Sequence, residues 1–252
     1  MKKSKIILTG VCTASIVIGA LSVYSGVRSK KLDNLKLTVP DSFTVTAHTG
    51  CLGTEDNSLE SMRVGAQNAD IIEVDIMFAE DGTPVLAHSK VNNNSVALSQ
   101  ALGFVKESGV RANLDIKQAQ DLSGVQSLIK SLDLTDLVFY TGIEEKDVEA
   151  VKKHSPDISY YLNADVDKKR NTDKQYLQSL ADKVKDLGAV GINLSFKGAS
   201  KELVDTFHEN GLLVSVWTVD GKNDIIRMLA MQVDNITSRK PDKVREIIET
   251  HK

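Results

Sequence analysis

The sequence predicts a single (β/α)₈ TIM barrel that follows an apolar N-terminal segment. Short apolar runs rich in β-branched residues alternate with amphipathic helical stretches from residue 43 to the C-terminus, which is typical of a parallel sheet covered by helices. Eight strand-like runs occur in a chain of 252 residues, which is long enough for one barrel. The alternation by itself also fits a doubly wound open sheet, but eight β/α units favour the closed barrel.

The predicted strands are short and evenly distributed along the chain. They cover residues 43–48, 71–78, 111–117, 138–140, 159–162, 189–194, 213–217 and 235–237. Helical patterns begin near Ser58, Ser99, Ser123, Glu144, Thr172, Lys201 and Asn223, and a last helix covers residues 241–250. After the second strand, Asp81-Gly82 is a tight-turn signal followed by the apolar residues 84–87, which predicts a small hairpin insertion.

The N-terminal segment has the character of an export signal. Residues 6–27 form a run of 22 residues without a charge, preceded by lysines, and such a run spans a hydrocarbon core of about 30 Å. We therefore expect a signal anchor or signal peptide in residues 1–31, a linker in 32–41 and the barrel in 42–252. The run is longer than a removable signal usually is, which favours a single-pass membrane anchor with the barrel outside the cytoplasm. Cleavage, which would release a secreted barrel, stays open.

The charge of the barrel argues against a nucleic-acid partner. Six of the 31 basic residues flank the apolar run, so the chain beyond Lys31 carries 25 basic and 34 acidic side chains, a net charge of −9. Binding to a phosphate backbone requires a basic surface. An acidic body instead leaves room for a cation site.

Polar side chains stand at the end of the first predicted strand, on the second and third, and at the end of the hairpin. In a barrel of this kind, the carboxyl ends of the strands face the mouth and carry the function. Residues two apart on a strand point to the same side, so the pairs at 73 and 75 and at 115 and 117 each face one way. The residues expected to converge are His48, Glu73, Asp75, His88, Asp115 and Lys117.

Three of these residues predict a metal site. Glu73 and Asp75 lie on an otherwise apolar strand, where two carboxylates are costly to bury without a positive charge. Together with Asp115 they offer hard oxygen ligands, which suit Mg²⁺ or Ca²⁺ better than Zn²⁺. Each carboxylate could instead form an ion pair with Lys117 or Arg111.

The histidines divide into two groups. His154, His208 and His251 fall in helical or terminal stretches and are expected at the surface. His48 and His88 each follow an apolar run beside the acidic cluster, where a pair of imidazoles can serve as base and acid near neutral pH.

The order of these motifs resembles that of the glycerophosphodiester phosphodiesterase family, over roughly residues 43 to 245. That family has barrels with an opening His-Arg-Gly, then Glu-Asn-Thr, Glu-Leu-Asp, His-Asp and Glu-Ile-Lys. The corresponding segments here are His48-Thr49-Gly50, Asp56-Asn57-Ser58, Glu73-Val74-Asp75, His88-Ser89 and Asp115-Ile116-Lys117.

The resemblance implies an enzyme that uses a divalent cation to hydrolyse a glycerophosphodiester, or a related phospholipid-derived diester, to glycerol 3-phosphate and an alcohol. It implies that Glu73, Asp75 and Asp115 hold the metal, that His48 and His88 are the acid/base pair and that Lys117 contacts phosphate. It also places Asp56 among the substrate-binding residues. Trp217, the only tryptophan, ends the seventh predicted strand and could line the substrate groove or pack in the core.

Departures from the family pattern keep other functions open. Thr49 replaces an arginine that would hold phosphate in a bidentate fork, and Asp115 replaces a glutamate and so reaches less far. A catalytically degenerate barrel that binds phospholipid headgroups or a partner at the cell envelope is the main alternative. A further possibility is an enzyme that acts on intact phospholipid or on a glycerol-phosphate polymer.

Overall fold

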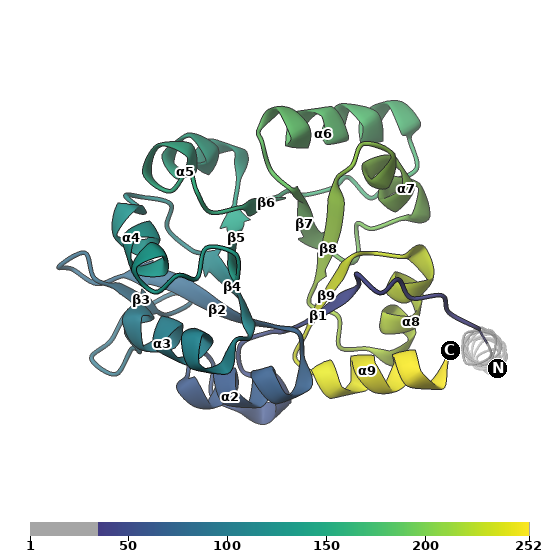
Figure 1. Ribbon diagram of the computed structural model, residues 1–252. Coiled ribbons are helices and arrows are strands. Elements are labelled where there is room, and N and C mark those ends of the chain that lie inside the picture. Colours follow the sequence, from purple (N-terminus) through teal and green to yellow (C-terminus); the bar gives the residue numbers. More distant parts are fainter. Residues whose placement is uncertain (1–34, 252) are drawn as a thin grey trace, which may run out of the picture.

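Eight parallel strands close into a barrel in the computed structural model, which describes residues 35–251 (Figure 1). The order around the barrel is β1, β2, β4, β5, β6, β7, β8 and β9, and β1 closes it by pairing with both β2 and β9. The barrel strands are β1 (Thr44–Ala47), β2 (Ile71–Phe78), β4 (Arg111–Ile116), β5 (Val138–Ile143), β6 (Tyr160–Asn163), β7 (Gly191–Ser195), β8 (Leu213–Trp217) and β9 (Asn235–Ser238). The predicted TIM barrel is confirmed, and the open sheet is wrong.

The predicted hairpin insertion is also present. Strand β3 (Pro84–Leu86) pairs antiparallel with the end of β2, and Phe78 lies opposite Pro84. The hairpin extends beyond the barrel on the side of α3 and α4 (Figure 1). It places His88, two residues past β3, beside the mouth.

The helices cover the outside of the barrel. They are α2 (Leu59–Asn68), α3 (Leu98–Ser108), α4 (Ser123–Ser131), α5 (Val148–His154), α6 (Lys174–Asp186), α7 (Lys201–Glu209), α8 (Lys222–Met231) and α9 (Pro241–Thr250). Short 3₁₀ turns occupy Cys51–Gly53 and Glu145–Asp147. The side chains of Ser58, Asp173 and Ser200 accept hydrogen bonds from backbone N–H groups in the first turns of α2, α6 and α7, which fixes where these helices begin. The helix expected to begin near Glu144 starts as the 3₁₀ turn Glu145–Asp147 and continues as α5.

The hydrophobic core lies between the strands and the helices rather than inside the barrel. Alternate residues such as Ile72, Val74 and Ile76 of β2 are buried in the apolar cluster beneath the helices. The intervening residues face inward, and many are buried polar groups: Thr46, Glu73, Asp75, Asn113, Thr141, Asn193, Ser215, Asn235 and Thr237. Inside the barrel, Asn235 donates to Thr46 at 2.8 Å and accepts from Ser215 at 3.1 Å. Hydrogen bonds thus offset the cost of burying these side chains.

The two ends of the described chain meet at α9. The backbone N–H of Leu37 donates to the carbonyl of His251 at 2.7 Å, and both residues are buried. The expectation of a surface position for His251 is therefore wrong, because residues 35–40 cover the end of α9. The predicted membrane segment, residues 6–27, lies outside the described residues, and none of the helices in 35–251 is long and apolar enough to cross a bilayer.

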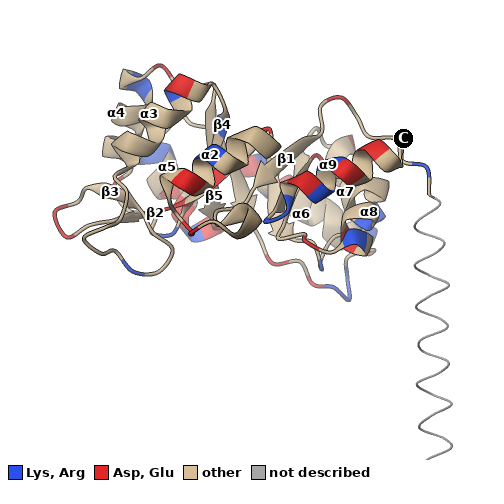
Figure 2. Ribbon diagram, turned by 90° about the horizontal axis from the view of Figure 1, so that it is seen from below, with Lys and Arg blue, Asp and Glu red and all other residues tan. Residues whose placement is uncertain are grey.

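Acidic and basic side chains are interspersed on the helices seen in Figure 2. Several oppositely charged residues form surface pairs, such as Arg245 with Asp70 at 2.7 Å.

Candidate metal and catalytic site at the barrel mouth

Three carboxylates from the neighbouring strands β2 and β4 meet at the mouth of the barrel. Asp75 lies directly opposite Asp115 in the strand register, and Glu73 is on the same side of β2 as Asp75. Ligand oxygens of Glu73, Asp75 and Asp115 all lie within 4.8 Å of one another. Burial, together with the charges of Asp75 and Asp115, raises the pKa of Glu73 well above its usual range. A cation among these oxygens would relieve that repulsion, so the donor set fits a hard divalent metal ion.

Lys117 supplies a positive charge beside the cluster. Its Nζ lies 2.8 Å from an oxygen of Asp75 and 2.6 Å from an oxygen of Asp115. Burial of Nζ acts to lower the pKa of Lys117, but the two carboxylates outweigh it and raise this pKa above its usual range. Arg111 lies at the opposite end of β4, with its guanidinium 5.6 Å from the centre of the Phe139 ring. Of the two ion-pair partners that the sequence left open, the structure therefore gives the role to Lys117.

His48 follows β1 and points into the same region. Its Nδ1 lies 2.8 Å from the carbonyl oxygen of Thr49 and 3.7 Å from Oε2 of Glu73. A carbonyl oxygen only accepts hydrogen bonds, so Nδ1 carries the proton and the neutral ring keeps a lone pair on Nε2. Burial, which outweighs the bond to Thr49, lowers the pKa of His48. This histidine is therefore suited to accept a proton at Nε2.

His88 approaches from the hairpin. The backbone N–H of Ala87 donates to the carbonyl of Asp75 at 3.0 Å, which ties the chain before His88 to β2 beside the carboxylate cluster. The imidazole is exposed, and it lines a cavity that His48 also lines. Two imidazoles thus border one space.

That space, here called the catalytic cavity, has a volume of about 380 Å³. Trp217, 40% exposed at the end of β8, forms part of its wall and does not pack in the core. The other lining side chains include Glu73, Asn113, Asp115, Lys117, Thr141, Glu144, Asn163 and Asn193. The cavity therefore combines carboxylates, a lysine, two imidazoles and an indole.

Comparison with known proteins identifies the family. A model of the glycerophosphoryl diester phosphodiesterase family matches residues 98–243, more than half of the chain. The chain belongs to this family. It is accordingly a phosphoric diester hydrolase, as the resemblance of its motifs implied.

Relatives of this phosphodiesterase agree in sequence and in fold. The glycerophosphodiester phosphodiesterase of Caldanaerobacter subterraneus is 25% identical over 238 residues, which cover 81% of this chain and 97% of the relative. The structure of a glycerophosphodiester phosphodiesterase from Parabacteroides distasonis superposes with a TM-score of 0.69 at 18% identity, covering 83% of this chain and 98% of that chain. A phosphodiesterase from Oleispira antarctica, solved in complex with the product sn-glycerol-3-phosphate, gives a TM-score of 0.68 at 17% identity, covering 84% and 97%.

The loop after β1 supports the carboxylates of this phosphodiesterase. The backbone N–H of Thr49 donates to Oε2 of Glu73 at 2.8 Å. The Thr49 hydroxyl accepts from the backbone N–H of Asn57 at 2.5 Å and is buried, so it does not line the catalytic cavity. Thr49 therefore does not replace the phosphate contact of the family arginine.

Asp56 is the one predicted site residue that lies apart. Its side chain is exposed and lines a neighbouring cavity of about 900 Å³, which adjoins the catalytic cavity only at His88. Asp56 packs against Gly50, where an added Cβ would lie 2.0 Å from Oδ1 of Asp56 and where φ is 71°. Asp56 thus shapes the loop rather than the catalytic cavity.

Several polar residues at the mouth went unrecognised in the sequence. The side chain of Asn57 donates to Asp75 at 2.8 Å, and Thr141 donates to both Asn113 and Asp115 at 2.9 and 3.2 Å. Asn163 accepts from Asn193 at 3.1 Å. Asn113 and Asn193 stand on predicted strands at positions that alternate with apolar residues, and this alternation is the signal that could have indicated them. Thr141 lies one residue beyond the predicted end of its strand.

Proposed function

We propose that the protein hydrolyses a glycerophosphodiester, or a related phospholipid-derived diester, to glycerol 3-phosphate and an alcohol in a reaction that depends on a divalent cation. The observation that carries the proposal is that His48, His88 and Lys117 line one cavity together with Glu73 and Asp115, two members of the three-carboxylate cluster. The family and the product bound to the Oleispira antarctica relative support this choice of substrate.

The three carboxylates would hold the cation. Glu73, Asp75 and Asp115 present only oxygen ligands, which suits Mg²⁺ or Ca²⁺. A bound cation would neutralise charge on the phosphate oxygens and so stabilise the transition state. Asp115 reaches the cluster despite its shorter side chain, because it lies directly opposite Asp75 in the register.

Lys117 and the two histidines would act on the substrate. The ammonium of Lys117 lies at the cluster, where it can contact a phosphate oxygen. His48, with its lone pair on Nε2, accepts a proton from the attacking water as the new O–P bond forms. His88 donates a proton to the oxygen of the departing alcohol as its bond to phosphorus breaks. The proposed base, His48, and the proposed acid, His88, border the same cavity.

We further propose that residues 6–27 hold the barrel at a membrane on its extracytoplasmic side. The uncharged length of this segment supports the proposal. Fractionation of cells that produce the full chain would test it, since a cleaved signal would release a shorter protein from the membrane fraction.

Turnover of defined diesters is the decisive experiment for the reaction. The full chain, purified in mild detergent, is assayed with glycerophosphocholine before and after chelation, and glycerol 3-phosphate is measured. We expect chelation to abolish turnover, readdition of Mg²⁺ or Ca²⁺ to restore it, and His48→Ala or Asp75→Asn to prevent it. His154→Ala, a histidine outside the site, is the control.

A cation-independent reaction would refute the proposed metal dependence. If no diester is turned over and His48→Ala changes nothing, the enzyme proposal fails and a binding role for the barrel is favoured.

A further inference from the structure

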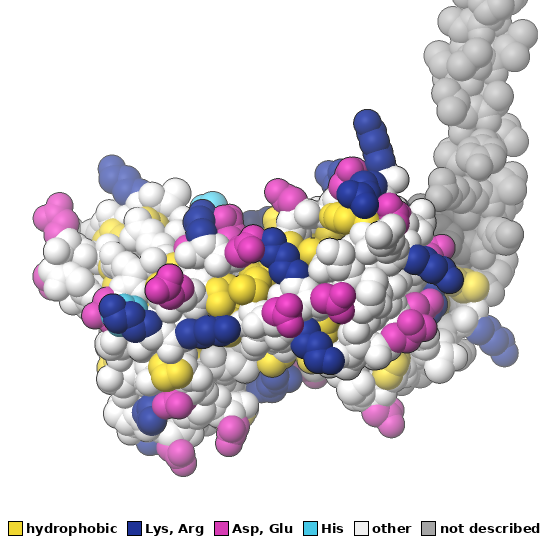
Figure 3. All heavy atoms as spheres, turned by 90° about the horizontal axis from the view of Figure 1, so that it is seen from above, with side chains coloured by type: hydrophobic (Ala, Val, Ile, Leu, Met, Phe, Trp, Pro, Cys, Tyr) yellow, Lys and Arg dark blue, Asp and Glu magenta, His cyan; other side chains and the backbone are white. Residues whose placement is uncertain are grey.

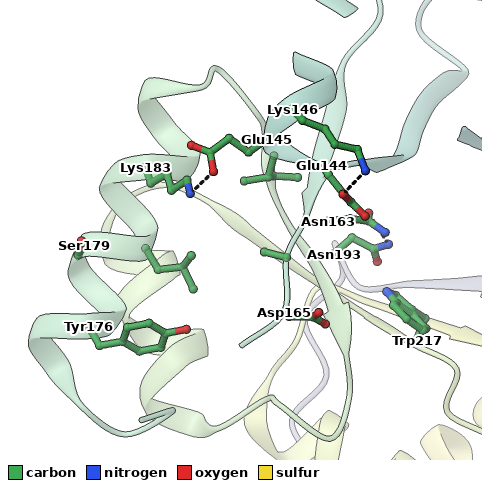
Figure 4. Close-up of a pocket in the computed structure, with 13 residues that line it drawn as sticks. Glu144, Glu145, Lys146, Asn163, Asp165, Tyr176, Ser179, Lys183, Asn193 and Trp217 are labelled. Carbon is green, nitrogen blue, oxygen red and sulfur yellow. Dashed lines mark hydrogen bonds and ion pairs between the residues drawn. The ribbon is translucent and has the colours of Figure 1, made fainter. Parts of the chain in front are cut away.

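A second cavity opens from the catalytic cavity toward α6. It has a volume of about 830 Å³ and is lined from the ends of β6 and β7, the 3₁₀ turn before α5, and α6 (Figure 4). Glu144, Asn163, Asn193 and Trp217 line both cavities, so the two spaces share a wall. A substituent on a phosphate held near Lys117 can therefore pass Trp217 into this second cavity.

The second cavity carries one uncompensated negative charge. Glu144 pairs with Lys146 at 2.7 Å, and Glu145 pairs with Lys183. Asp165, by contrast, has no hydrogen-bond or ion-pair partner among residues 35–251. Figure 4 shows the Asp165 carboxylate directed to the side of the cavity where Trp217 lies. The charges that line this cavity thus sum to one negative charge, located at Asp165.

The remaining wall suits a group with apolar edges. Leu162, Ala164 and Leu180 contribute aliphatic surface, and the indole of Trp217 is 40% exposed. Figure 3 shows hydrophobic surface between charged side chains on the face of the molecule that carries α6. An indole face attracts a cation, with about 0.5–1 kcal/mol at exposed sites and more when the cation is desolvated. A carboxylate, an indole and aliphatic groups together form a setting for an alkylated ammonium.

We propose that the second cavity binds the alcohol substituent of the diester, and that Asp165 and Trp217 make it selective for alcohols that carry an ammonium group. The proposal rests on the proposed diesterase function and specifies its substrate. An anionic substituent meets the unpaired Asp165 and is disfavoured, and a neutral polyol gains neither the ion pair nor the contact with the indole.

The binding test uses Trp217 as its own reporter, because it is the only tryptophan in the chain. The full protein is titrated with choline and with 3,3-dimethylbutan-1-ol, the uncharged carbon analogue of choline, and the tryptophan fluorescence is recorded. We expect a saturable change with choline and an affinity about five- to tenfold lower for the analogue. Asp165→Asn should bring the two affinities closer together, whereas Asp182→Asn, on α6 and outside the cavity, should leave them apart.

The kinetic test compares two substrates that differ in the charge of the alcohol. In the wild-type protein kcat/KM for glycerophosphocholine should exceed that for glycerophosphoglycerol, and Asp165→Asn should lower this ratio about fivefold. Equal affinity for choline and its analogue, no saturable fluorescence change, or a ratio unaffected by Asp165→Asn would each overturn the subsite. Choline binding that depends on Asp165 without any diester turnover would sustain the subsite and refute the proposed reaction instead.

Discussion

Asn57 and Asp75 exchange two hydrogen bonds across the mouth of the barrel. The Asn57 amide donates to Oδ2 of Asp75 at 2.8 Å, and the backbone N–H of Asp75 donates to Oδ1 of Asn57 at 2.9 Å. Asn57 adopts a left-handed backbone conformation, with φ of 56°, which asparagine tolerates better than most residues. A loop residue thereby fixes the orientation of a buried carboxylate in the proposed metal site.

Replacing Asn57 should weaken cation binding without unfolding the barrel. Asn57→Gly keeps the left-handed conformation accessible but removes the amide, so Asp75 loses the group that orients it. We expect the affinity for Mg²⁺ or Ca²⁺, measured by titration calorimetry, to fall about 10- to 100-fold. Asn93→Gly, in the exposed loop after the hairpin, is the matched control. Equal affinities in the two variants would show that Asn57 does not support the site.

Cation binding should stabilise the folded protein, because the repulsion among Glu73, Asp75 and Asp115 is not relieved when the cation is absent. At a free cation concentration about 100 times Kd, binding adds about 2.7 kcal/mol to the free energy of unfolding, which raises Tm by roughly 5–10 °C for a domain of this size. Differential scanning calorimetry with and without chelator measures the shift. No shift with any divalent cation would contradict the proposed metal site.

Glu73 should also make the free energy of unfolding depend on pH. The folded-state pKa of Glu73 is raised, so the folded protein binds this proton more tightly than the unfolded chain, and its contribution to stability is lost as pH rises through that pKa. In chelator, the stability of the wild-type protein relative to Glu73→Gln should therefore decrease as pH rises from about 5 to about 8. Urea titrations at several pH values measure it, and a difference that grows with pH would be the contrary result.

Gly142 holds the end of β5 against Asp115. Its φ is 76°, and a Cβ there would lie 2.4 Å from both Oδ1 of Asp115 and the carbonyl oxygen of Ile116. Gly142→Ala should cost about 1–3 kcal/mol of unfolding free energy and should displace Asp115, which weakens cation binding. Gly103→Ala, in the interior of α3 with nothing within 4 Å of the added Cβ, should instead be neutral or stabilising. Urea unfolding together with calorimetric titration separates the two effects.

Lys117 should matter for turnover more than for folding. Lys117→Gln removes the positive charge that faces the substrate phosphate, and we expect kcat/KM to fall about 10²- to 10³-fold. Lys90→Gln, in the loop after the hairpin and lining only the neighbouring cavity, should retain full activity. Circular dichroism confirms that both variants fold. Comparable activity of the two would remove Lys117 from the proposed mechanism.

The order of the elements could be predicted from the sequence because it depends on local patterns. The bounds of β2, β8 and α9 match their predicted ranges, and the tight turn at Asp81-Gly82 produces the expected hairpin. The end of one strand was predicted less accurately. Strand β5 continues to Ile143 rather than ending at Tyr140, because its last residues pair with β6. Pairing across strands is not visible in a local pattern.

Periodicity and motif order are properties of neighbouring residues, so the sequence was enough to predict the barrel, the family, and the group of carboxylates and histidines expected at the mouth. Closure of the barrel was needed to show that polar side chains such as Asn113 and Asn235 fill it, that Asn57 orients Asp75 while Asp56 lies apart from the catalytic cavity, and that Trp217 lines two cavities. These relationships join residues far apart in the chain, and they arise when closure of the sheet brings the ends of its strands around one space.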